Sequence, residues 1–382
     1  MPDLSECRER IDRIDTQIMR LLMERQAVSA DVAAYKAATG KPVFDRARER
    51  EKIQRATELV PPELASYASV LQTILMEASR DAQHQLLADR SSDVSGRIRD
   101  ALANQSAYFP FRATVACQGV EGAYQQIAVD RLFRQPQIEF CDTFEEVFDA
   151  VESGRCEFGV LPVENSTAGS VNCVYDLLRS RDAYIVRSCR LKIEHNLLVR
   201  PGARKEDIRI VYSHEQAIRQ CSHYLAGMPE ARVHICENTA MAAEKVAQAD
   251  RDDVAAIASR DCAQLYGLEI CEHGVQDQSS NYTRFACITK DLVIYPGADR
   301  ASLVAVLDHE PGSLYKVLAK FYALDINLIK LESRPIPGRD FEFMFYFDGE
   351  CPAAAPQFLS LMDALDDACE ECRYLGSYSE VI

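Results

Sequence analysis

The first ninety residues carry basic side chains at the spacing of a helix face. Arg25 and Lys36 are 11 positions apart, about three helical turns, so both side chains lie on one face. Arg8 precedes Arg25 by 17 positions and lies about 100° around the same helix. Arg8 can therefore join that face only from elsewhere, for instance from the partner chain of an intertwined dimer.

Further polar groups follow at helical spacing. Asp45, Arg48 and Glu49 share one face of a second predicted helix. Ser79 and Gln83 form an i, i+4 pair in an otherwise apolar third helix, where inward-facing polar groups need partners. Together these side chains offer cations, a carboxylate and amide donors, without a nucleophile, a metal cluster or a cofactor motif. On spacing alone, a helical dimerisation domain with surface ion pairs explains them equally well.

Small polar side chains also gather at the end of a predicted buried strand. In VLPVENSTAGSV, residues 160–171, an apolar run ends in one carboxylate, Glu164, which Asn165, Ser166 and Thr167 follow. Short hydroxyl and amide side chains beside exposed backbone amides suit a small anion that carries hydroxyl groups.

Two more segments place polar groups at predicted strand ends. VYSHEQAIRQC, residues 211–221, has Ser213 at a natural helix start and Gln220 about two turns later. SSNYTRF contains Thr283 and Arg284. Helix N-termini bind carboxylates, and ligands of open α/β sheets bind beyond the strand ends. Each loop alone is typical of an ordinary turn, so only their combination indicates a site.

The elements that position the first set of residues are helices. Apolar residues recur at three- and four-residue steps through residues 5–87, and Gly40 with Pro42 ends the first helix. Shorter helices are predicted over 44–59 and 62–87. A first helix of roughly 50 Å cannot bury its apolar stripe against two shorter partners, so we expect an intertwined dimer.

The remaining sequence changes character twice. Residues 91–112 are interpreted as a linker, and short apolar strands then alternate with helices in an α/β pattern. From residue 301 the order is strand, helix, strand, strand, helix and a last short strand, as in ferredoxin-like folds. We therefore expect a multidomain protein with an all-α domain over 1–90, an α/β domain over 113–296 and an α+β domain over 297–382.

Composition excludes several classes of protein. Hydrophobic residues make up 47% of the 382 residues and charged residues 27%, as in ordinary globular chains. A net charge of −16 argues against nucleic acid or anionic membranes as partners. No apolar stretch suits a membrane span and the N-terminus lacks an apolar signal core, so we expect a cytoplasmic protein. The 14 cysteines, including the pair Cys369 and Cys372, are interpreted as reduced thiols rather than a metal site.

The N-terminal motifs RERIDRID, MERQAV, AYKA, PVFDRARE and EASRDAQ resemble the all-helical chorismate mutase family over residues 5–87. The resemblance implies that Lys36 and Gln83 bind the breaking ether oxygen of chorismate, and that Asp45 and Glu49 hold its hydroxyl end. It also implies a set of carboxylate-binding residues: Arg8 of the partner chain, Arg25, Arg48 and Ser79. A Claisen rearrangement needs no acid or base, only a held conformation and fixed donors where charge develops.

Residues 113–295, with the TRF element, resemble prephenate dehydratase, whose two α/β lobes enclose a cleft like a periplasmic binding protein. The resemblance implies that Thr283 is the main catalytic residue. It also implies residues that line the substrate cleft: Glu164, Asn165, Ser166, Thr167, Ser213, Gln220 and Arg284. A donor must protonate the leaving hydroxyl. A threonine hydroxyl is a poor acid that can donate a hydrogen bond, and the sequence leaves open whether Glu164 or a relay supplies the proton.

EPGSLYKVLAKF and LESRP resemble the ACT regulatory domain attached to prephenate dehydratases. The resemblance implies that L-phenylalanine is an effector. Its site would comprise two short segments: Gly312, Ser313, Leu314, Glu332, Ser333 and Arg334. A dimerisation module that senses nothing is the alternative interpretation.

The resemblances together predict a bifunctional enzyme that needs no cofactor or metal. It would convert chorismate to prephenate and prephenate to phenylpyruvate, as a homodimer or higher homo-oligomer. A fusion to prephenate dehydrogenase would require a dinucleotide-binding GxGxxG after a strand, which the sequence lacks. An arogenate dehydratase in place of the prephenate enzyme, and a ligand sensor without activity, stay open as alternatives.

Overall fold

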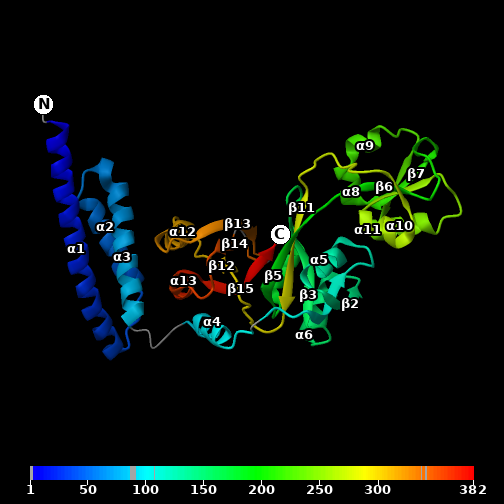
Figure 1. Ribbon diagram of the computed structural model, residues 1–382. Coiled ribbons are helices and arrows are strands. Elements are labelled where there is room, and N and C mark those ends of the chain that lie inside the picture. Colours follow the sequence, from blue (N-terminus) through cyan, green and yellow to red (C-terminus); the bar gives the residue numbers. More distant parts are fainter. Residues whose placement is uncertain (1–2, 87–91, 107, 337, 340–341) are drawn as a thin grey trace. The chain divides into compact units, whose positions relative to one another are not determined.

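The computed structural model describes residues 3–86, 92–106, 108–336, 338–339 and 342–382 (Figure 1). The chain forms two compact units, Met1–Ser92 and Asp93–Ile382, and each is described by itself. Within the described ranges, no helix is long and apolar enough to cross a membrane.

The first unit consists of three α-helices and one short 3₁₀ turn, as the apolar spacing predicts. Their bounds are α1 Leu4–Thr39, α2 Arg46–Glu58, η1 Pro62–Leu64 and α3 Ala65–Leu86. Gly40 ends α1 in the left-handed conformation, with φ of 68°, and its N–H bonds back to the Lys36 carbonyl. With 36 residues, α1 is about 54 Å long, whereas α3 has 22 residues and reaches about 33 Å.

This helical unit buries very little apolar surface. Ala33 and Met76 are its only buried apolar residues among those described. The α1 helix packs on α3, and α2 also packs on α3. Large apolar side chains on the first and third helices stay exposed: Ile11, Ile14, Ile18, Leu21, Val28, Val32, Tyr35, Val70, Leu71 and Ile74. An unpartnered face of this size is typical of a protein–protein interface.

The second unit contains a lobe built on five strands of a ten-stranded sheet, called the catalytic lobe because the predicted catalytic residue Thr283 lies in it. Its strands are β1 Arg112–Gln118, β2 Gln135–Cys141, β3 Phe158–Asn165, β5 Tyr184–Lys192 and β11 Tyr282–Thr289, with β4 Gly169–Ser170 beside β3. They run in the order β5-β11-β3-β1-β2, and β11 is antiparallel to both neighbours. The helices are α5 Tyr124–Leu132, α6 Phe144–Glu152 and α7 Asn172–Ser180.

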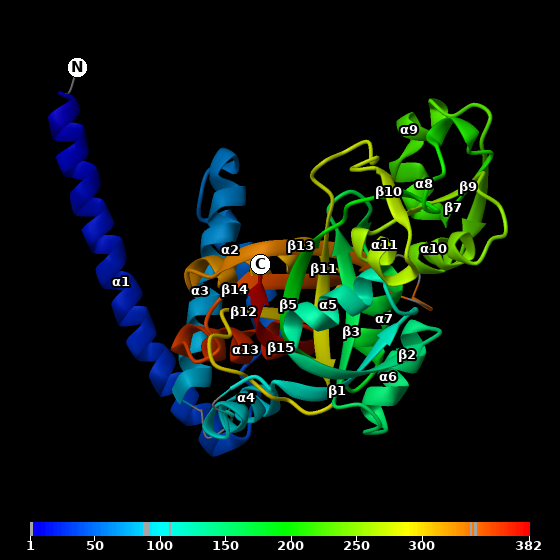
Figure 2. The same ribbon diagram turned by 45° about the vertical axis from the view of Figure 1, so that its right-hand side comes forward.

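A second lobe lies beyond the ten-stranded sheet (Figures 1 and 2). It has its own sheet, with the strand order β10-β6-β9-β7-β8. The strands are β6 Asn196–Val199, β7 Ile210–His214, β8 Arg232–Cys236, β9 Val254–Ala258 and β10 Glu269–Glu272. The helical segments are η2 Lys205–Asp207, α8 Glu215–Gln220, α9 Ser222–Ala226, α10 Thr239–Ala247 and α11 Arg260–Tyr266. The chain enters this lobe after β5 and leaves it before β11, so two crossing segments join the lobes.

The C-terminal subdomain has the expected βαββαβ order. Its elements are β12 Arg300–Val306, α12 Ser313–Ala323, β13 Asn327–Pro335, β14 Phe343–Glu350, α13 Pro356–Ala368 and β15 Glu371–Val381. The four strands pair antiparallel in the order β13-β14-β12-β15. One sheet face packs against α12 and α13, and the other packs against α7 of the catalytic lobe.

The last strand differs from the short strand that we expected. It has 11 residues, and its final segment, Ser379–Val381, pairs in parallel with β5, so the two sheets become one. Gly376 makes this crossing possible, because a Cβ there would lie 2.2 Å from the Ile185 carbonyl oxygen. The pairing depends on that close approach, which hydrophobic periodicity does not encode.

The predicted linker over 91–112 also requires correction, because α4 spans Asp93–Ala103. Its apolar stripe of Val94, Ile98, Ala101 and Leu102 packs into the core of the C-terminal subdomain, and Ile98 is fully buried. The serine and glycine residues of this stretch obscured a helical pattern that is weak in so short a segment.

Candidate functional sites

The helical unit brings part of its predicted site together at the contact between α1 and α3. Arg25 donates to the Leu75 carbonyl, and burial lowers the pKa of its guanidinium. The hydroxyls of Ser29 and Ser79 bond each other. Buried Gln83 donates to the Ser79 carbonyl at 3.1 Å, and its Oε1 has no partner among the described atoms. These groups form a polar lining within a largely apolar helix contact.

The loop before α2 supplies the next groups. Lys36 Nζ donates to the Val43 carbonyl at 2.6 Å, which leaves two of its three protons for a ligand. Asp45 caps α2 by accepting the Arg48 N–H at 3.1 Å. The Asp45 carboxylate therefore caps a helix, in addition to the substrate-binding role that the sequence predicts for it.

Other predicted residues of this unit are not gathered within one chain. Arg8 is exposed in the first turns of α1. The Arg48 side chain is 56% exposed and pairs with Glu51 at 2.7 Å. Glu49 forms an ion pair with Arg80, a residue of the EASRDAQ stretch that the sequence analysis did not single out. Arg80 lies three positions after Glu77 on α3, so its helical spacing could have identified it.

In the catalytic lobe, Asn165 at the end of β3 is the centre of a network of amide groups. Its Oδ1 accepts the N–H groups of Thr167 at 3.0 Å and Ala168 at 2.9 Å. Two backbone donors fix that oxygen, so the opposite end of the amide must be the NH₂ group. That Nδ2 donates to Thr283 Oγ1 at 2.9 Å and to Asn281 Oδ1 at 2.8 Å.

The same logic sets the direction of every following bond. Since Asn281 Oδ1 accepts, its Nδ2 donates to Gln220 Oε1 at 3.0 Å, and Gln220 Nε2 donates to Thr167 Oγ1 at 3.1 Å. Gln220 Oε1 also lies 3.0 Å from His195 Nε2, so that nitrogen carries a proton. Burial lowers the pKa of His195, which is consistent with a neutral ring.

The network determines what Thr283 can do. Its Oγ1 accepts a hydrogen bond from the Asn165 amide, and no described residue accepts its own hydroxyl proton, so that proton can be donated to a substrate. Strand pairing places Thr283 directly opposite Asn165, with β11 against β3. The geometry thus presents one oriented hydroxyl donor that is 8% exposed.

The network also contains residues that the sequence analysis missed. Asn281 is 1% exposed and His195 is 3% exposed, and both lie in the two segments that cross between the lobes. Asn281 belongs to the SSNYTRF motif, but nothing in the neighbouring sequence indicates that a loop asparagine is buried. By contrast, Ser213 is fully buried and donates to the Ile257 carbonyl at 2.7 Å, so the structure does not bring it into the network. Ser166 exchanges hydrogen bonds with the backbone of Ser280 and Tyr282.

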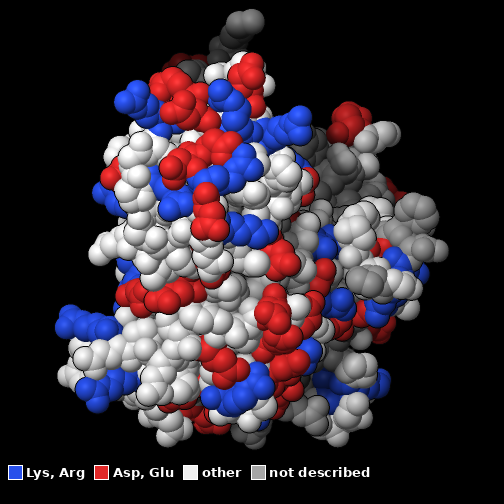
Figure 3. Space-filling view, turned by 90° about the vertical axis from the view of Figure 1, so that its right-hand side faces the viewer, with Lys and Arg blue, Asp and Glu red and all other residues white. Residues whose placement is uncertain are grey.

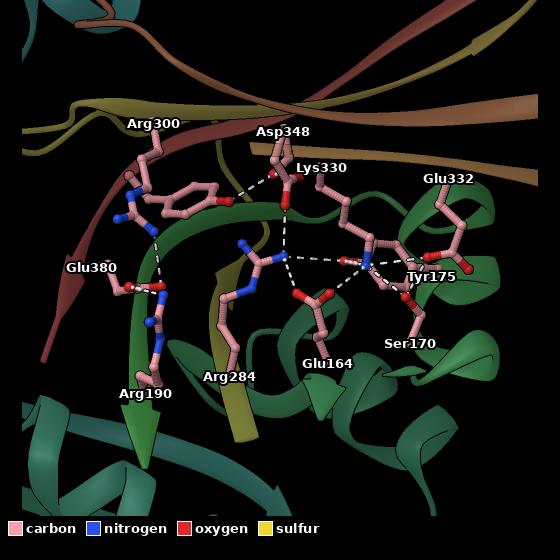
Figure 4. A network of polar contacts seen from close by, with 12 residues as sticks. Glu164, Ser170, Tyr175, Arg190, Arg284, Arg300, Lys330, Glu332, Asp348 and Glu380 are labelled. Carbon is pink, nitrogen blue, oxygen red and sulfur yellow. Dashed lines mark hydrogen bonds and ion pairs between the residues drawn. The ribbon is translucent and has the colours of Figure 1, made fainter. Parts of the chain in front are cut away.

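A chain of alternating charges links the catalytic lobe to the C-terminal subdomain (Figure 4). This charge chain consists of Asp348, Arg284, Glu164, Lys330 and Glu332. Arg284 contacts Asp348 at 2.6 Å and Glu164 at 3.1 Å. Lys330 lies 3.5 Å from Glu164 and 3.3 Å from Glu332. Burial alone would lower the pKa of Arg284, but the Asp348 carboxylate outweighs this effect and raises it.

A small cavity lies beside Arg284, lined also by Ser188, Ser302 and Tyr378. Arg284 Nε and Ser188 Oγ are buried without a partner among the described atoms. The cavity has room for about one water molecule, and these two unpaired polar atoms are suitable hydrogen-bond partners for it. Arg284 was predicted to bind substrate, whereas the structure places its guanidinium among protein carboxylates.

The three predicted effector residues of β13 lie on both faces of the C-terminal sheet. Glu332 and Tyr346 are paired across β13 and β14, and Tyr346 packs against Tyr175 of α7. Glu332 therefore faces the catalytic lobe, whereas Ser333 points to the helix face. Arg334 pairs with Asp176 of α7 at 3.1 Å. Gly312, Ser313 and Leu314 lie at the start of α12, with Gly312 at a φ of 89°.

The described part of the chain contains no disulfide and no cluster of metal ligands. All fourteen cysteines are free, and no group of three or more His, Cys, Asp or Glu residues there could hold a metal ion. Figure 3 shows acidic and basic side chains interspersed across the described part of one face, without a continuous basic surface.

Comparison with known families assigns both catalytic regions. The profile of the chorismate mutase type II family matches residues 7–84, and the profile of the prephenate dehydratase family matches residues 115–292. The bifunctional chorismate mutase/prephenate dehydratase of Escherichia coli K12 is 30% identical over 379 residues, which cover 97% of this chain and 95% of that protein. The chain belongs to this bifunctional family. It is an enzyme with a chorismate mutase domain and a prephenate dehydratase domain.

Some other relatives cover a smaller share of this bifunctional enzyme. An arogenate dehydratase/prephenate dehydratase of Arabidopsis thaliana is 40% identical over 283 residues, 69% of this chain and 68% of its own. The structure of a prephenate dehydratase from Arthrobacter aurescens in complex with L-Phe is 26% identical, with a TM-score of 0.63, and covers 70% of this chain and 89% of that one. A quorum-quenching acylase has 31% identity, a TM-score of 0.64 and coverage of 70% and 98%.

Proposed function

We propose that this enzyme rearranges chorismate to prephenate in its helical unit, and then converts prephenate to phenylpyruvate, water and CO₂ in its second unit. The observation that carries the dehydratase assignment is the Thr283 hydroxyl, whose oxygen accepts from Asn165 and whose proton is free. The order of the two reactions follows from the product of the first being the substrate of the second. The chain would act in the cytoplasm and need no cofactor.

In the mutase step the protein positions its substrate and does not exchange protons with it. Arg25 and Lys36 would bind the dianion, and Lys36 with Gln83 would donate to the ether oxygen as its negative charge grows. Gln83 is buried at the α1–α3 contact, where solvent does not compete for its amide. Arg8 is exposed in its own chain, so a second copy would bring it to this site.

The second copy would also cover the apolar face of α1 and α3. Among the described residues this unit buries only Ala33 and Met76 as apolar side chains, too little for a stable independent fold. We therefore propose a homodimer, or a larger homo-oligomer, in which two long first helices pack against each other.

In the dehydratase step Thr283 would donate a hydrogen bond to the leaving hydroxyl of prephenate, and one proton that comes ultimately from solvent would convert that hydroxyl to water. The C–O bond then breaks to release water, and the C–C bond to the ring carboxylate breaks to release CO₂ as the ring becomes aromatic. A threonine hydroxyl is a weak acid, so a strong hydrogen bond that sharpens in the transition state suffices here. Asn165, Gln220 and Thr167 would hold the substrate and orient Thr283.

The effector that we propose is L-phenylalanine, bound by the C-terminal subdomain acting as an ACT domain. The relative from Arthrobacter aurescens contains L-Phe, which supports this assignment. Glu332 would take part in binding, so Glu332→Ala is expected to relieve inhibition by phenylalanine. Dehydratase rates that do not change across millimolar phenylalanine in the unmodified enzyme would contradict the proposal.

Arogenate is the competing substrate for the second site, since the Arabidopsis relative carries both activities in its name. The match to that relative covers 69% of this chain. This chain also contains a chorismate mutase domain, which the family profile matches over residues 7–84. A mutase on the same chain supplies prephenate directly, which favours prephenate.

The experiment that tests the whole proposal gives the purified protein chorismate alone and follows the products. Phenylpyruvate formed without any added nucleotide is the expected result. Prephenate that accumulates without further reaction would contradict the dehydratase assignment, and arogenate would then be offered as the second substrate. No consumption of chorismate would contradict the mutase assignment.

A further inference from the structure

Lys330 of β13 reaches from the C-terminal subdomain into the catalytic lobe (Figure 4). Its Nζ donates to the Ser170 hydroxyl at 2.6 Å and to the Tyr175 hydroxyl at 3.0 Å. The ammonium group also lies 4.5 Å from the centre of the Tyr175 ring, within the range of a cation–π interaction. With only 8% of its side chain exposed, Lys330 differs from an ordinary surface lysine, which keeps its charge in water.

The same ammonium group joins two carboxylates that belong to different parts of the protein. Glu164 on β3 lies 3.5 Å away and Glu332 on β13 lies 3.3 Å away. Glu164 immediately precedes Asn165, which donates to Thr283. One ion pair and one peptide unit therefore separate Lys330 from the hydrogen-bond network of Asn165 and Thr283.

Lys330 also fixes the loop that carries the small polar residues. Ser170 accepts from Lys330 and contacts Glu332, and β4 pairs Ser170 with Glu164 on β3. One ammonium group thus contacts both sides of the turn that contains Ser166 and Thr167. Without it, both Glu164 and the turn would lose a partner that comes from outside the catalytic lobe.

We propose that Lys330 is a positioning residue of the dehydratase, and that it transmits effector binding to that site. It holds the Glu164 carboxylate and the Ser170 hydroxyl in the geometry that prephenate requires. An amino acid that recruits Glu332 withdraws one of the two carboxylates from Lys330 and so changes its hold on Glu164. This inference rests on the proposed function, because it assigns a partner and a regulatory role to that same dehydratase site.

The energetics of buried charges favour a positioning role over a purely stabilising one. Removing one partner of a buried ion pair is costly when the remaining charge stays buried. The side chains of Glu164 and Glu332 are 38% and 31% exposed, so water can reach both carboxylates once the Lys330 ammonium group is gone. Lys330→Met keeps the aliphatic length and can pack on the Tyr175 ring. We therefore expect a folded protein in which Glu164 and Ser170 are held less firmly, because each has lost one of its partners.

The experiment measures steady-state dehydratase kinetics with prephenate for the full-length enzyme and its variants. In Lys330→Met we expect the KM for prephenate to rise roughly tenfold and kcat to fall by a similar factor. A rise in KM is the diagnostic result, since a misfolded fraction lowers kcat and leaves KM unchanged. Lys330→Arg keeps the charge and is expected to restore most of the lost activity.

Lys205→Met is the matched control. Lys205 likewise pairs with a glutamate, Glu272, at 2.6 Å and lies 4.5 Å from the centre of a tyrosine ring, that of Tyr224. These partners lie in the second lobe and outside the charge chain. We expect this variant to keep the wild-type KM, and both variants to keep full mutase activity.

The effector part of the inference has its own measurement. L-phenylalanine is expected to raise the KM of the wild-type enzyme and to leave that of Lys330→Met unchanged. Calorimetry with L-phenylalanine should show that this variant still binds the amino acid. Inhibition of Lys330→Met to the same degree as the wild type would overturn the transmitting role.

The outcomes separate this inference from the proposed function. If the wild type converts prephenate and Lys330→Met shows the same KM, the positioning role is overturned while the proposed function stands. If the wild type makes no phenylpyruvate at all, both are overturned. Should Lys330→Met fail to fold, Ser170→Ala removes only one hydroxyl from the same contact, and a KM equal to that of the wild type would then refute the inference.

Discussion

The helical unit and the catalytic lobe hold their polar residues in different ways. In the lobe, Asn165, Asn281 and Gln220 orient one another within one chain, starting from two backbone N–H groups. In the helical unit, Arg8 is exposed, Arg48 is 56% exposed and only two apolar side chains are buried among the described residues. Folding alone therefore completes the network around Thr283, whereas we propose that the mutase site requires association with a second copy.

The largest effect is expected at Thr283, the hydroxyl donor of the folded network. Thr283→Val keeps the shape but removes the proton, so dehydratase turnover should fall by about 10³-fold while mutase activity is unchanged. Thr289→Val makes the same change on the same strand, at a hydroxyl that donates to the Glu157 carbonyl, and should leave turnover intact. Normal turnover in Thr283→Val would remove this residue from catalysis.

Lys36→Ala tests the proposed mutase site of the helical unit. Loss of an ammonium donor beside a developing oxyanion should lower mutase turnover by about 10²- to 10³-fold and leave the dehydratase unchanged. Lys41→Ala, a charge removal five positions away in the same unit, serves as the control. A mutase rate within a factor of about two of the wild type would place Lys36 outside the site.

Ile18→Glu addresses association directly. Ile18 is 46% exposed on α1, and a glutamate there would be buried without a partner in a dimer contact, at a cost of several kcal/mol. Mutase activity at submicromolar protein should fall more than tenfold and recover in part on concentration, while the dehydratase rate per chain stays constant. A mutase rate that is independent of concentration in this variant would show that the site is complete in one chain.

Asn281→Leu breaks the network without touching Thr283. Asn165 and Gln220 each lose a partner, so we expect about a tenfold loss of dehydratase turnover and a loss of roughly 1–3 kcal/mol in stability. Asn104→Leu, an exposed position at the end of α4, controls for the substitution itself. Unchanged turnover would mean that the bond between Asn165 and Thr283 keeps its geometry without Asn281.

The smallest effect concerns pH. Burial lowers the pKa of His195 from its usual 6.5, and it lowers that of His214 in the same direction. When the pH falls below about 6.5, the unfolded chain therefore binds more protons than the folded chain. The buried neutral histidines cost no stability above that pH and destabilise the folded state below it. The melting temperature of the dehydratase should drop between about pH 7.5 and 5.5, and His195→Gln should reduce that drop. An equal drop in both proteins would assign it to other groups.

The sequence by itself determined the elements and the residue types of both sites. Helical periodicity, Gly40, and the proline pair Pro61–Pro62 predicted the three helices of the first unit within a few residues. The motifs around Asn165 and Thr283 predicted polar residues at strand ends, and the structure places these two residues directly opposite each other on β3 and β11. These features follow from local rules: the period of a helix or strand, and the conformations that glycine and proline allow.

Only the tertiary structure decided which distant residues meet. Lys330 reaches Glu164, Asp348 reaches Arg284 and Asn281 reaches Gln220, all across more than fifty positions of sequence. The tertiary structure likewise turned the predicted linker into α4 and extended β15 onto β5. Spacing along a chain fixes the face on which a side chain lies, but not the element that packs against that face. That choice depends on the burial of whole surfaces, which no single motif contains.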